Sequence, residues 1–132
     1  MVGNIRKKKN NKPEDLIVRP QIKLLCLQFG IDVYDIQASN YDPYRKTLTR
    51  YHHVPPGFPD LCGIGPEGIA VFIELKAPKR RSNLSELQRY FLTNAIKRKA
   101  FACVTDSMEH FSNLWYKWKE AKSIQLLLDD LP

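Results

Sequence analysis

Two carboxylates and a lysine lie at the ends of two neighbouring apolar segments of this sequence. Asp60 follows a proline at the start of DLCGIG (60–65), and the apolar run IAVFIELKA (69–77) carries Glu74 and Lys76 near its end. Residues two apart on a strand share a face, so Glu74 and Lys76 project together. If the two segments pair through the intervening GPEG turn, Asp60 lies across from them. The sequence therefore predicts three ionisable groups at one edge of a sheet.

Such a group of side chains has a clear use in phosphate chemistry. Hard divalent cations such as Mg²⁺ take oxygen ligands, usually one or two carboxylates, and water and substrate phosphate complete the shell. A cation held there lowers the pKa of a bound water and neutralises charge on the phosphate. Lys76 could orient or deprotonate that water. The alternative is a surface hairpin with an ordinary Glu and Lys, because E-x-K alone is common in any protein. The conjunction of Pro-Asp, an apolar strand and E-x-K favours a site.

The size and charge of the chain are those of one basic domain. Its 132 residues, of which 43% are hydrophobic, suffice for a core without disulfides or metal. We expect a basic disordered tail over residues 1–12 and a single domain over residues 13–132. Lys and Arg outnumber Asp and Glu by 21 to 14, which gives a net charge of +7 and favours a polyanionic partner such as DNA. The run RKKKNNK in the tail supplies part of this excess, and its plainer interpretation is a solvated segment.

The cysteines and the hydropathy pattern point to a reducing, non-membrane setting. Cys26, Cys62 and Cys103 form no CxxC pair and lie in apolar contexts typical of a core, which fits the cytoplasm. No apolar stretch is long enough to span a bilayer, so we expect neither a signal peptide nor an anchor. His52 and His53 are adjacent and have no further ligand at a fitting interval, which disfavours a zinc site.

The elements that must position the acids alternate in type along the chain. An apolar helical pattern with Ile17, Leu24, Leu25 and Leu27 runs from Pro13 to Gly30, where Pro20 marks either a kink or the true first turn. Residues 39–57 read as a long loop or an irregular hairpin. The other expected elements are strands at 31–37, 60–65, 69–77 and 101–106, a helix from Ser82 or Ser85 to about Lys99, and a last helix with Met108, Phe111, Trp115 and Trp118 on one face. We expect an α/β (α+β) fold in which helices flank a small mixed sheet.

The segments GFPDL, FIELKAP, LSELQRYF and FACVTD together resemble the PD-(D/E)XK nuclease superfamily, and in particular the VRR-NUC domain, whose pattern runs G-x-P-D-L, I-E-x-K and a helix bearing Gln. The resemblance spans about residues 57–106 and implies a restriction-endonuclease-like core. It implies that Asp60 and Glu74 bind Mg²⁺ or Mn²⁺, that the backbone carbonyl of Leu75 joins them, and that Lys76 serves catalysis.

The resemblance also places Gln88 near the metal or the substrate. A rival explanation is that Ser85-x-x-Gln88 has capping-box spacing, in which Gln88 satisfies the helix start. Such folds further carry an acidic residue on the first helix close to the metal, for which Glu14 is the candidate and Asp15 the rival. A glutamate in a first helical turn is favourable for the helix dipole in any case.

Basic residues near the acids are candidates for contacts with the DNA backbone. Tyr41, Tyr44 and Tyr51 in the long loop could stack on unpaired bases. The residues that we expect to bind DNA are Arg45, Lys46, Arg50, Lys79, Arg80 and Arg81. The alternative is a solvated loop. No helix-turn-helix or zinc finger appears, so reading of base sequence in the major groove is not expected.

The function implied by the resemblance is that of a Mg²⁺- or Mn²⁺-dependent endodeoxyribonuclease, bacterial or phage-encoded, that cuts structured or branched DNA. The compact form resembles Holliday-junction resolvases, which act as homodimers because two symmetric cuts need two sites. Trp115, Trp118 and the apolar tail IQLLLDDLP could form such a contact, although tryptophans on a terminal helix are more often internal. The alternative function is a nucleic-acid-binding protein without catalysis, but clustered carboxylates repel such a ligand.

Overall fold

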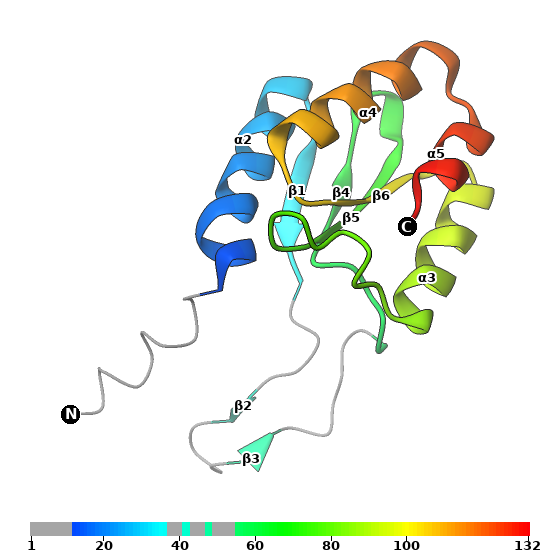
Figure 1. The fold of residues 1–132 in the computed structure, drawn as a ribbon. Coiled ribbons are helices and arrows are strands. Elements are labelled where there is room, and N and C mark those ends of the chain that lie inside the picture. The colour runs from blue at the N-terminus through cyan, green and yellow to red at the C-terminus, as the bar shows by residue number, and fades with distance from the viewer. Residues whose placement is uncertain (1–11, 37–40, 43–46, 49–54) are drawn as a thin grey trace.

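The computed structural model describes residues 12–36, 41–42, 47–48 and 55–132, which form an α+β fold on a four-stranded mixed sheet (Figure 1). The expected fold class is therefore confirmed. All of the predicted tail except Lys12 lies outside the described residues. In chain order the elements are η2 (Glu14–Val18), α2 (Arg19–Phe29), β1 (Asp32–Asp35), β2 (Tyr41–Asp42), β3 (Thr47–Leu48), β4 (Leu61–Ile64), η3 (Pro66–Gly68), β5 (Ala70–Leu75), α3 (Glu86–Lys97), β6 (Phe101–Thr105), α4 (Met108–Ala121) and α5 (Ile124–Asp130).

The first helix accommodates Pro20 by changing its hydrogen-bond pattern. The turn η2 is π-helical, and the backbone N–H of Arg19 donates to the Glu14 carbonyl. The α-helical part then begins at Arg19, so Pro20 falls in its first turn, the part of an α-helix in which proline is best tolerated. Gly30 ends the helix with φ 77°, as expected for a left-handed C-terminal cap.

The buried face of this helix differs from the one that its leucines indicate. Of the four apolar positions that define the predicted pattern only Leu25 is buried, whereas Ile17, Leu24 and Leu27 lie on the outer surface. The buried face consists of Val18, Ile22, Leu25 and Cys26. The helix is apolar on two sides, and periodicity alone could not tell which side faces the sheet.

The sheet has the strand order β1-β4-β5-β6. The β4–β5 hairpin is antiparallel and turns through η3, where the Gly65 N–H donates to the Ile69 carbonyl. Strand β1 pairs antiparallel with β4, and β6 pairs parallel with β5 after the crossover through α3. The expected hairpin is confirmed, and the predicted strands end within one or two residues of the observed ones.

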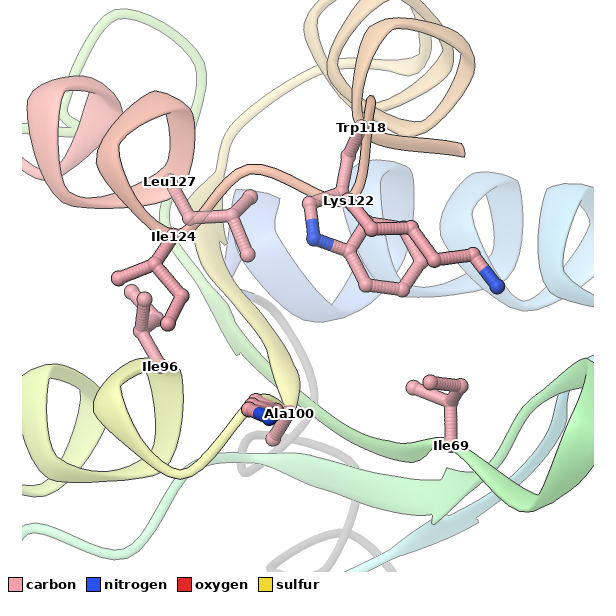
Figure 2. Close-up of a pocket in the computed structure, with 8 residues that line it drawn as sticks. Ile69, Ile96, Ala100, Trp118, Lys122, Ile124 and Leu127 are labelled. Atoms are coloured by element: carbon pink, nitrogen blue, oxygen red, sulfur yellow. The ribbon is translucent and has the colours of Figure 1, made fainter. Parts of the chain in front are cut away.

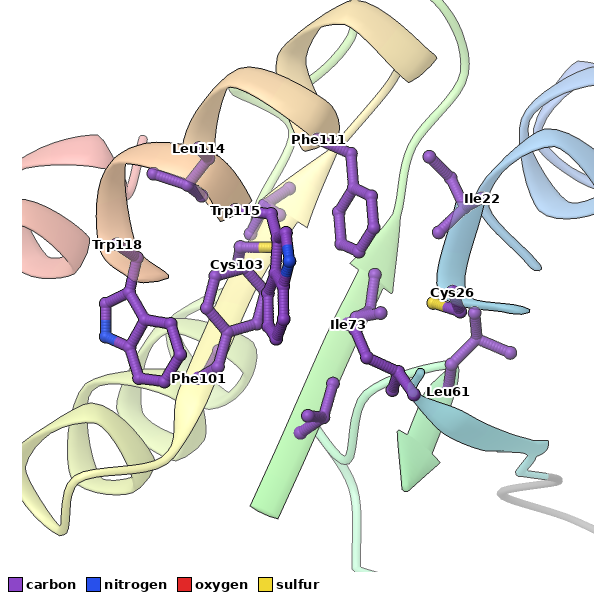
Figure 3. Close-up of a cluster of buried hydrophobic side chains, with 14 of the residues drawn as sticks. Ile22, Cys26, Leu61, Ile73, Phe101, Cys103, Phe111, Leu114, Trp115 and Trp118 are labelled. Atoms are coloured by element: carbon purple, nitrogen blue, oxygen red, sulfur yellow. The ribbon is translucent and has the colours of Figure 1, made fainter. Parts of the chain in front are cut away.

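One face of the sheet carries the main hydrophobic core. Val71, Ile73 and Leu75 of β5 alternate with the residues on the face of Glu74, and all three are fully buried. Figure 3 shows the side chains of α2 and α4 facing the strands from this side. The Phe101 ring lies 5.0 Å from the Trp115 ring and 5.2 Å from the Trp118 ring. Both tryptophans are buried, so they serve internal packing rather than an exposed contact.

The C-terminal segment folds into a helix that the sequence pattern did not indicate. Lys122 ends α4 in the left-handed region with φ 50°, and the Ser123 hydroxyl then accepts from the Leu126 N–H to start α5. Leu127 of α5 is buried in the core. The expectation of a single last helix was therefore wrong. Among the described residues, none of the helices is both long and apolar enough to cross a membrane.

A cavity of about 280 Å³ lies where α3, α4 and α5 meet near the start of β6 (Figure 2). Ile96, Trp118, Ile124 and Leu127 supply apolar walls, and Figure 2 shows them around one space. Among the described residues no carboxylate lines it, so it does not offer the oxygen ligands of a divalent-cation site.

Candidate active site

The hairpin register brings Asp60 and Glu74 together. Leu61 is paired with Ile73, so Asp60, one residue before β4, lies opposite Glu74. One oxygen of Asp60, Oδ2, accepts a hydrogen bond of 2.9 Å from the Leu75 N–H. This backbone donor fixes the carboxylate at the end of β5, with Oδ1 on its other side. The structure thus places the two predicted acids side by side, as the strand argument required.

Glu74 is 4% exposed, and one of its oxygens has no hydrogen-bond partner among the residues that the structure describes. Its Oε2 accepts 2.9 Å from Gln88 Nε2 and lies 3.5 Å from Lys76 Nζ. Its Oε1 is buried without a hydrogen bond. Burial and the adjacent Asp60 raise the pKa of Glu74 to about 8, although Lys76 works in the opposite direction. An orphaned carboxylate oxygen beside a second carboxylate is the donor set that a hard cation would satisfy.

Lys76 continues the β5 ladder beyond the strand end. Its backbone N–H donates to the Thr105 carbonyl over 3.0 Å. Its side chain is 13% exposed, and Nζ donates to Gln88 Oε1 over 3.2 Å. Lys76 therefore lies within reach of both Glu74 and the amide that holds Glu74. Ala77 follows past the end of the strand and is half-buried.

Gln88 completes the capping box that its spacing from Ser85 predicted, and it also contacts Glu74. Its backbone N–H donates to Ser85 Oγ over 3.1 Å, and its Oε1 accepts 3.0 Å from the Ser85 N–H, which completes a capping box. The same amide donates from Nε2 to Glu74. The cap fixes the amide plane, and the fixed amide orients the carboxylate. Helix α3 begins after Ser85, the second of the two predicted caps.

An aromatic cluster covers the strand face next to the acids. The Phe91 ring lies 4.7 Å from that of Phe58 and 5.1 Å from that of Phe72. Phe72 shares its face with Glu74, so this cluster explains a phenylalanine beside charged residues.

Gly57 lets the loop that carries Asp60 approach α3 closely. Its φ is 87°, and a Cβ at this position would lie 2.7 Å from the backbone carbon of Leu87, the residue before Gln88. Gly68 has a similar φ of 80°, but a Cβ added there would meet nothing within 4 Å. Glycine at position 57 is thus required for contact as well as for conformation.

Arg19 reaches the same site from the first helix, which the sequence did not indicate. Its Nε and Nη1 lie 3.1 Å from Asp15 Oδ1 and 2.6 Å from Asp35 Oδ1. Its Nη2 lies 3.9 Å from Asp60 Oδ1. Burial lowers the pKa of Arg19, but the hydrogen bonds that it donates to Asp35 and Asp15 outweigh this effect, so the pKa lies above its usual value. The i,i+4 spacing of Asp15 and Arg19 was visible in the sequence, but their proximity to Asp60 depends on the fold.

The first-helix acids do not join the carboxylate pair. Asp15 is engaged by Arg19, and Glu14 is half-buried at the start of η2. Among the described residues, no group of three or more His, Cys, Asp or Glu side chains is placed to hold a metal. Of the predicted ligand side chains within that part of the chain, Asp60 and Glu74 are the two that lie side by side. A role for Glu14 as a third ligand stays a prediction.

The predicted DNA contacts divide into three sets. Lys79 and Arg80 are exposed next to the site, and the Lys79 N–H donates to Asp106 Oδ2 over 2.7 Å. Arg81 instead donates to the Val104 carbonyl and to both the carbonyl and Oδ2 of Asp130, over 2.7–2.9 Å. Its guanidinium therefore ties α5 to the loop that follows Lys76. Arg45, Lys46 and Arg50, with His52 and His53, lie outside the described residues.

A hydroxyl, an imidazole and a carboxylate are also aligned near the end of β6. His110 Nδ1 lies 2.9 Å from Thr105 Oγ1, and Nε2 lies 3.0 Å from Asp130 Oδ2. Thr105 is 0% exposed, and its hydroxyl donates to the Ser107 carbonyl. No substrate can reach this hydroxyl, so the alignment is structural.

We expect Gly57→Ala to destabilise the protein more than Gly68→Ala. Both substitutions place a side chain at positive φ, which costs about 1–2 kcal/mol, but only the first adds a clash with the α3 backbone. Urea denaturation measures the difference in the free energy of unfolding. Equal losses in the two variants would show that the loop does not depend on this close approach.

We expect Glu74→Gln to stabilise the metal-free protein at pH 8. The folded-state pKa of about 8 exceeds the unfolded value near 4.5, so the folded protein binds the proton more tightly. The contribution of Glu74 to stability is therefore fully present below pH 4.5 and is lost as the pH rises through 8.

The free energy of unfolding of Glu74→Gln should therefore exceed that of wild type by a margin that grows as the pH rises. At pH 8 this margin should be on the order of a few kcal/mol. Thermal unfolding in EDTA from pH 4.5 to 8.5 measures it, with Glu120→Gln on the exposed side of α4 as control. A difference that is constant with pH would contradict the burial argument.

The comparisons with known proteins identify the family of this chain. The family model of the VRR-NUC domain matches residues 35–109, a segment that contains Asp60, Glu74, Lys76 and Gln88. Searches among curated proteins and among solved structures found no match. The matched segment covers more than half of the chain, and its motifs form the site described above. This chain therefore belongs to the VRR-NUC family of nuclease domains.

Proposed function

We propose that this chain is a Mg²⁺- or Mn²⁺-dependent endonuclease that hydrolyses phosphodiester bonds in structured or branched DNA. The family supplies the nuclease class, and a nuclease acts on nucleic acid as its substrate. The observation that carries the finer proposal is the buried Oε1 of Glu74, which has no partner and lies beside Asp60. A divalent cation would neutralise this pair, and no side chain within the described residues does so completely.

The residues that would hold the cation are Asp60 and Glu74, together with the backbone carbonyl of Leu75. All three groups present oxygen atoms, which are the ligands that Mg²⁺ and Mn²⁺ accept. When bound, such a cation supplies Lewis-acid activation of water and of the phosphate. Asp60 is already fixed by the Leu75 N–H, and Glu74 by Gln88, so the ligands need little reorganisation on binding.

Lys76 and Gln88 supply the remaining groups for hydrolysis. In the reaction, water forms a new bond to phosphorus and one P–O ester bond breaks, which leaves a phosphate monoester and a hydroxyl. The Lys76 ammonium lies 3.5 Å from Glu74 Oε2, where it can orient the water and stabilise negative charge on the phosphate. Gln88 holds the side chains of Lys76 and Glu74 next to each other, because its amide contacts both.

We expect Glu74→Ala to abolish cleavage while DNA binding persists. Loss of a metal ligand should lower the single-turnover rate by at least about 100-fold, and Lys76→Ala should act similarly. Binding of fluorescent DNA in EDTA, measured by anisotropy, should stay within about threefold of wild type, because neither side chain is needed for backbone contacts.

Wild-type protein that cuts no DNA with any divalent ion would overturn the enzyme assignment. Such a result, with binding intact, would favour a nucleic-acid-binding protein without catalysis.

Divalent-ion addition should also raise the melting temperature of wild type and not that of Glu74→Gln. A rise of equal size in both proteins would place the cation elsewhere.

Exposed basic residues beside the acids support a path for the DNA backbone. Arg80 follows Glu74 by six residues and is exposed, whereas the guanidinium of Arg81 is hydrogen-bonded to Asp130 of α5. In the binding assay above, Arg80→Ala should weaken DNA affinity and reduce its salt dependence. Arg98→Ala, at the exposed far end of α3, serves as its matched control.

Branched DNA and a homodimer form the last part of the proposal. Two symmetric cuts require two sites, and the first helix exposes Leu16, Ile17, Leu24 and Leu27 as an apolar surface that a second copy could cover. Cleavage of a four-way junction, a flap, a nick and plain duplex should be compared with one preparation. Sedimentation equilibrium of that preparation distinguishes dimer from monomer, and a monomer that resolves junctions would exclude the two-site scheme.

A further inference from the structure

The guanidinium of Arg19 borders the carboxylate pair, and each of its three nitrogens faces a different acid. Nε and Nη1 make hydrogen bonds of 3.1 Å and 2.6 Å to Asp15 and Asp35. Nη2 lies 3.9 Å from Asp60, which is beyond hydrogen-bond range. With respect to the described residues, the edge of the guanidinium that faces the active site therefore keeps donor capacity.

We propose that Arg19 is a catalytic residue that donates from Nη2 to a non-bridging oxygen of the phosphate under attack. This inference rests on the proposed nuclease activity. It adds to the site a residue from the first helix that lies outside the matched family segment, which begins at residue 35.

The fixed position of the guanidinium supports this role. The backbone of Arg19 belongs to a helix that is anchored in the core, because the neighbouring residues Val18 and Ile22 are both fully buried. Its two short ion pairs hold the planar group from two sides, and Lys23 reinforces Asp35 over 2.6 Å. A donor that is already oriented loses little entropy when a phosphate arrives, and a guanidinium matches phosphate geometry.

The distances argue against Arg19 acting only as a counter-ion of Asp60. Its short bonds go to Asp15 and Asp35, and Asp60 is held instead by the Leu75 N–H over 2.9 Å. A cation bound at Asp60 would still experience repulsion from Arg19 nearby. The two roles therefore predict opposite effects of removing the charge on cation affinity and on rate.

Arg19→Gln should slow cleavage and leave cation binding intact or tighter. The single-turnover rate at saturating Mn²⁺ and saturating junction DNA should fall on the order of 100-fold, as for loss of one oriented donor to a developing charge. The Mn²⁺ concentration for half-maximal thermal stabilisation should stay equal or fall, because a positive charge near Asp60 is gone. Arg19→Lys should recover less than about a tenth of the rate, since an ammonium lacks the fork.

Lys23→Gln provides the matched control. Lys23 lies one turn further along α2 and shares the partner Asp35, but no contact joins it to Asp60 within the described part of the chain. Its variant should keep the wild-type rate within about twofold under the same conditions. Loss of rate in both variants would assign the effect to Asp35 and to helix stability.

The outcomes separate this inference from the function on which it rests. Wild-type protein that cuts no DNA removes the nuclease proposal and the role of Arg19 with it. Wild-type cleavage with an unchanged rate in Arg19→Gln at saturating Mn²⁺ overturns only the role of Arg19. If circular dichroism shows that Arg19→Gln is unfolded, Arg19→Lys decides, because it retains the charge and the ion pair with Asp15. A wild-type rate in that variant also overturns the inference.

Discussion

A carboxylate that is almost completely buried next to a second carboxylate is the constraint around which this fold is arranged. Glu74 has one unpartnered oxygen, and Asp60 lies opposite in the hairpin. The surrounding structure holds the pair together despite their repulsion. It does so with a backbone N–H on Asp60, an amide on Glu74, and the cations Lys76 and Arg19 at the borders. These groups offset the unfavourable burial without removing it, and the remaining imbalance is the basis of the proposed cation site.

Side-chain hydrogen bonds connect helices α3, α4 and α5 to the strand ends that carry the site. Gln88 starts α3 and orients Glu74 with one amide, so the helix cap and the acid geometry form together. Arg81 and Asp130 connect the loop after Lys76 to α5, and His110 joins Asp130 from α4. Side chains from three helices are thereby linked to the end of one strand. A change in the position of α5 should therefore shift the loop that carries Lys79 and Arg80.

Features that depend on local spacing could be predicted from the sequence, whereas those that depend on long-range packing could not. The alternation of side chains in β5 and the GPEG turn determine the core face and the register that joins Asp60 to Glu74. Arg19 is far in sequence from Asp60, and no spacing reveals their approach. Helix α2 is apolar on two sides, so its buried face depends on how it meets the sheet. Helix α5 has a weak intrinsic signal and becomes helical because Leu127 packs into the core.

Because side chains alternate between the two faces along β4 and β5, insertions and deletions have different effects in the strands and in the turn. Extra residues that are absorbed within the turn at Pro66–Gly68 leave the pairing of Leu61 with Ile73 unchanged. Removal of a single residue inside either strand would instead rotate one acid to the opposite side of the sheet. Descendants of this sequence can therefore vary the turn length freely, whereas the strands change length only in steps of two.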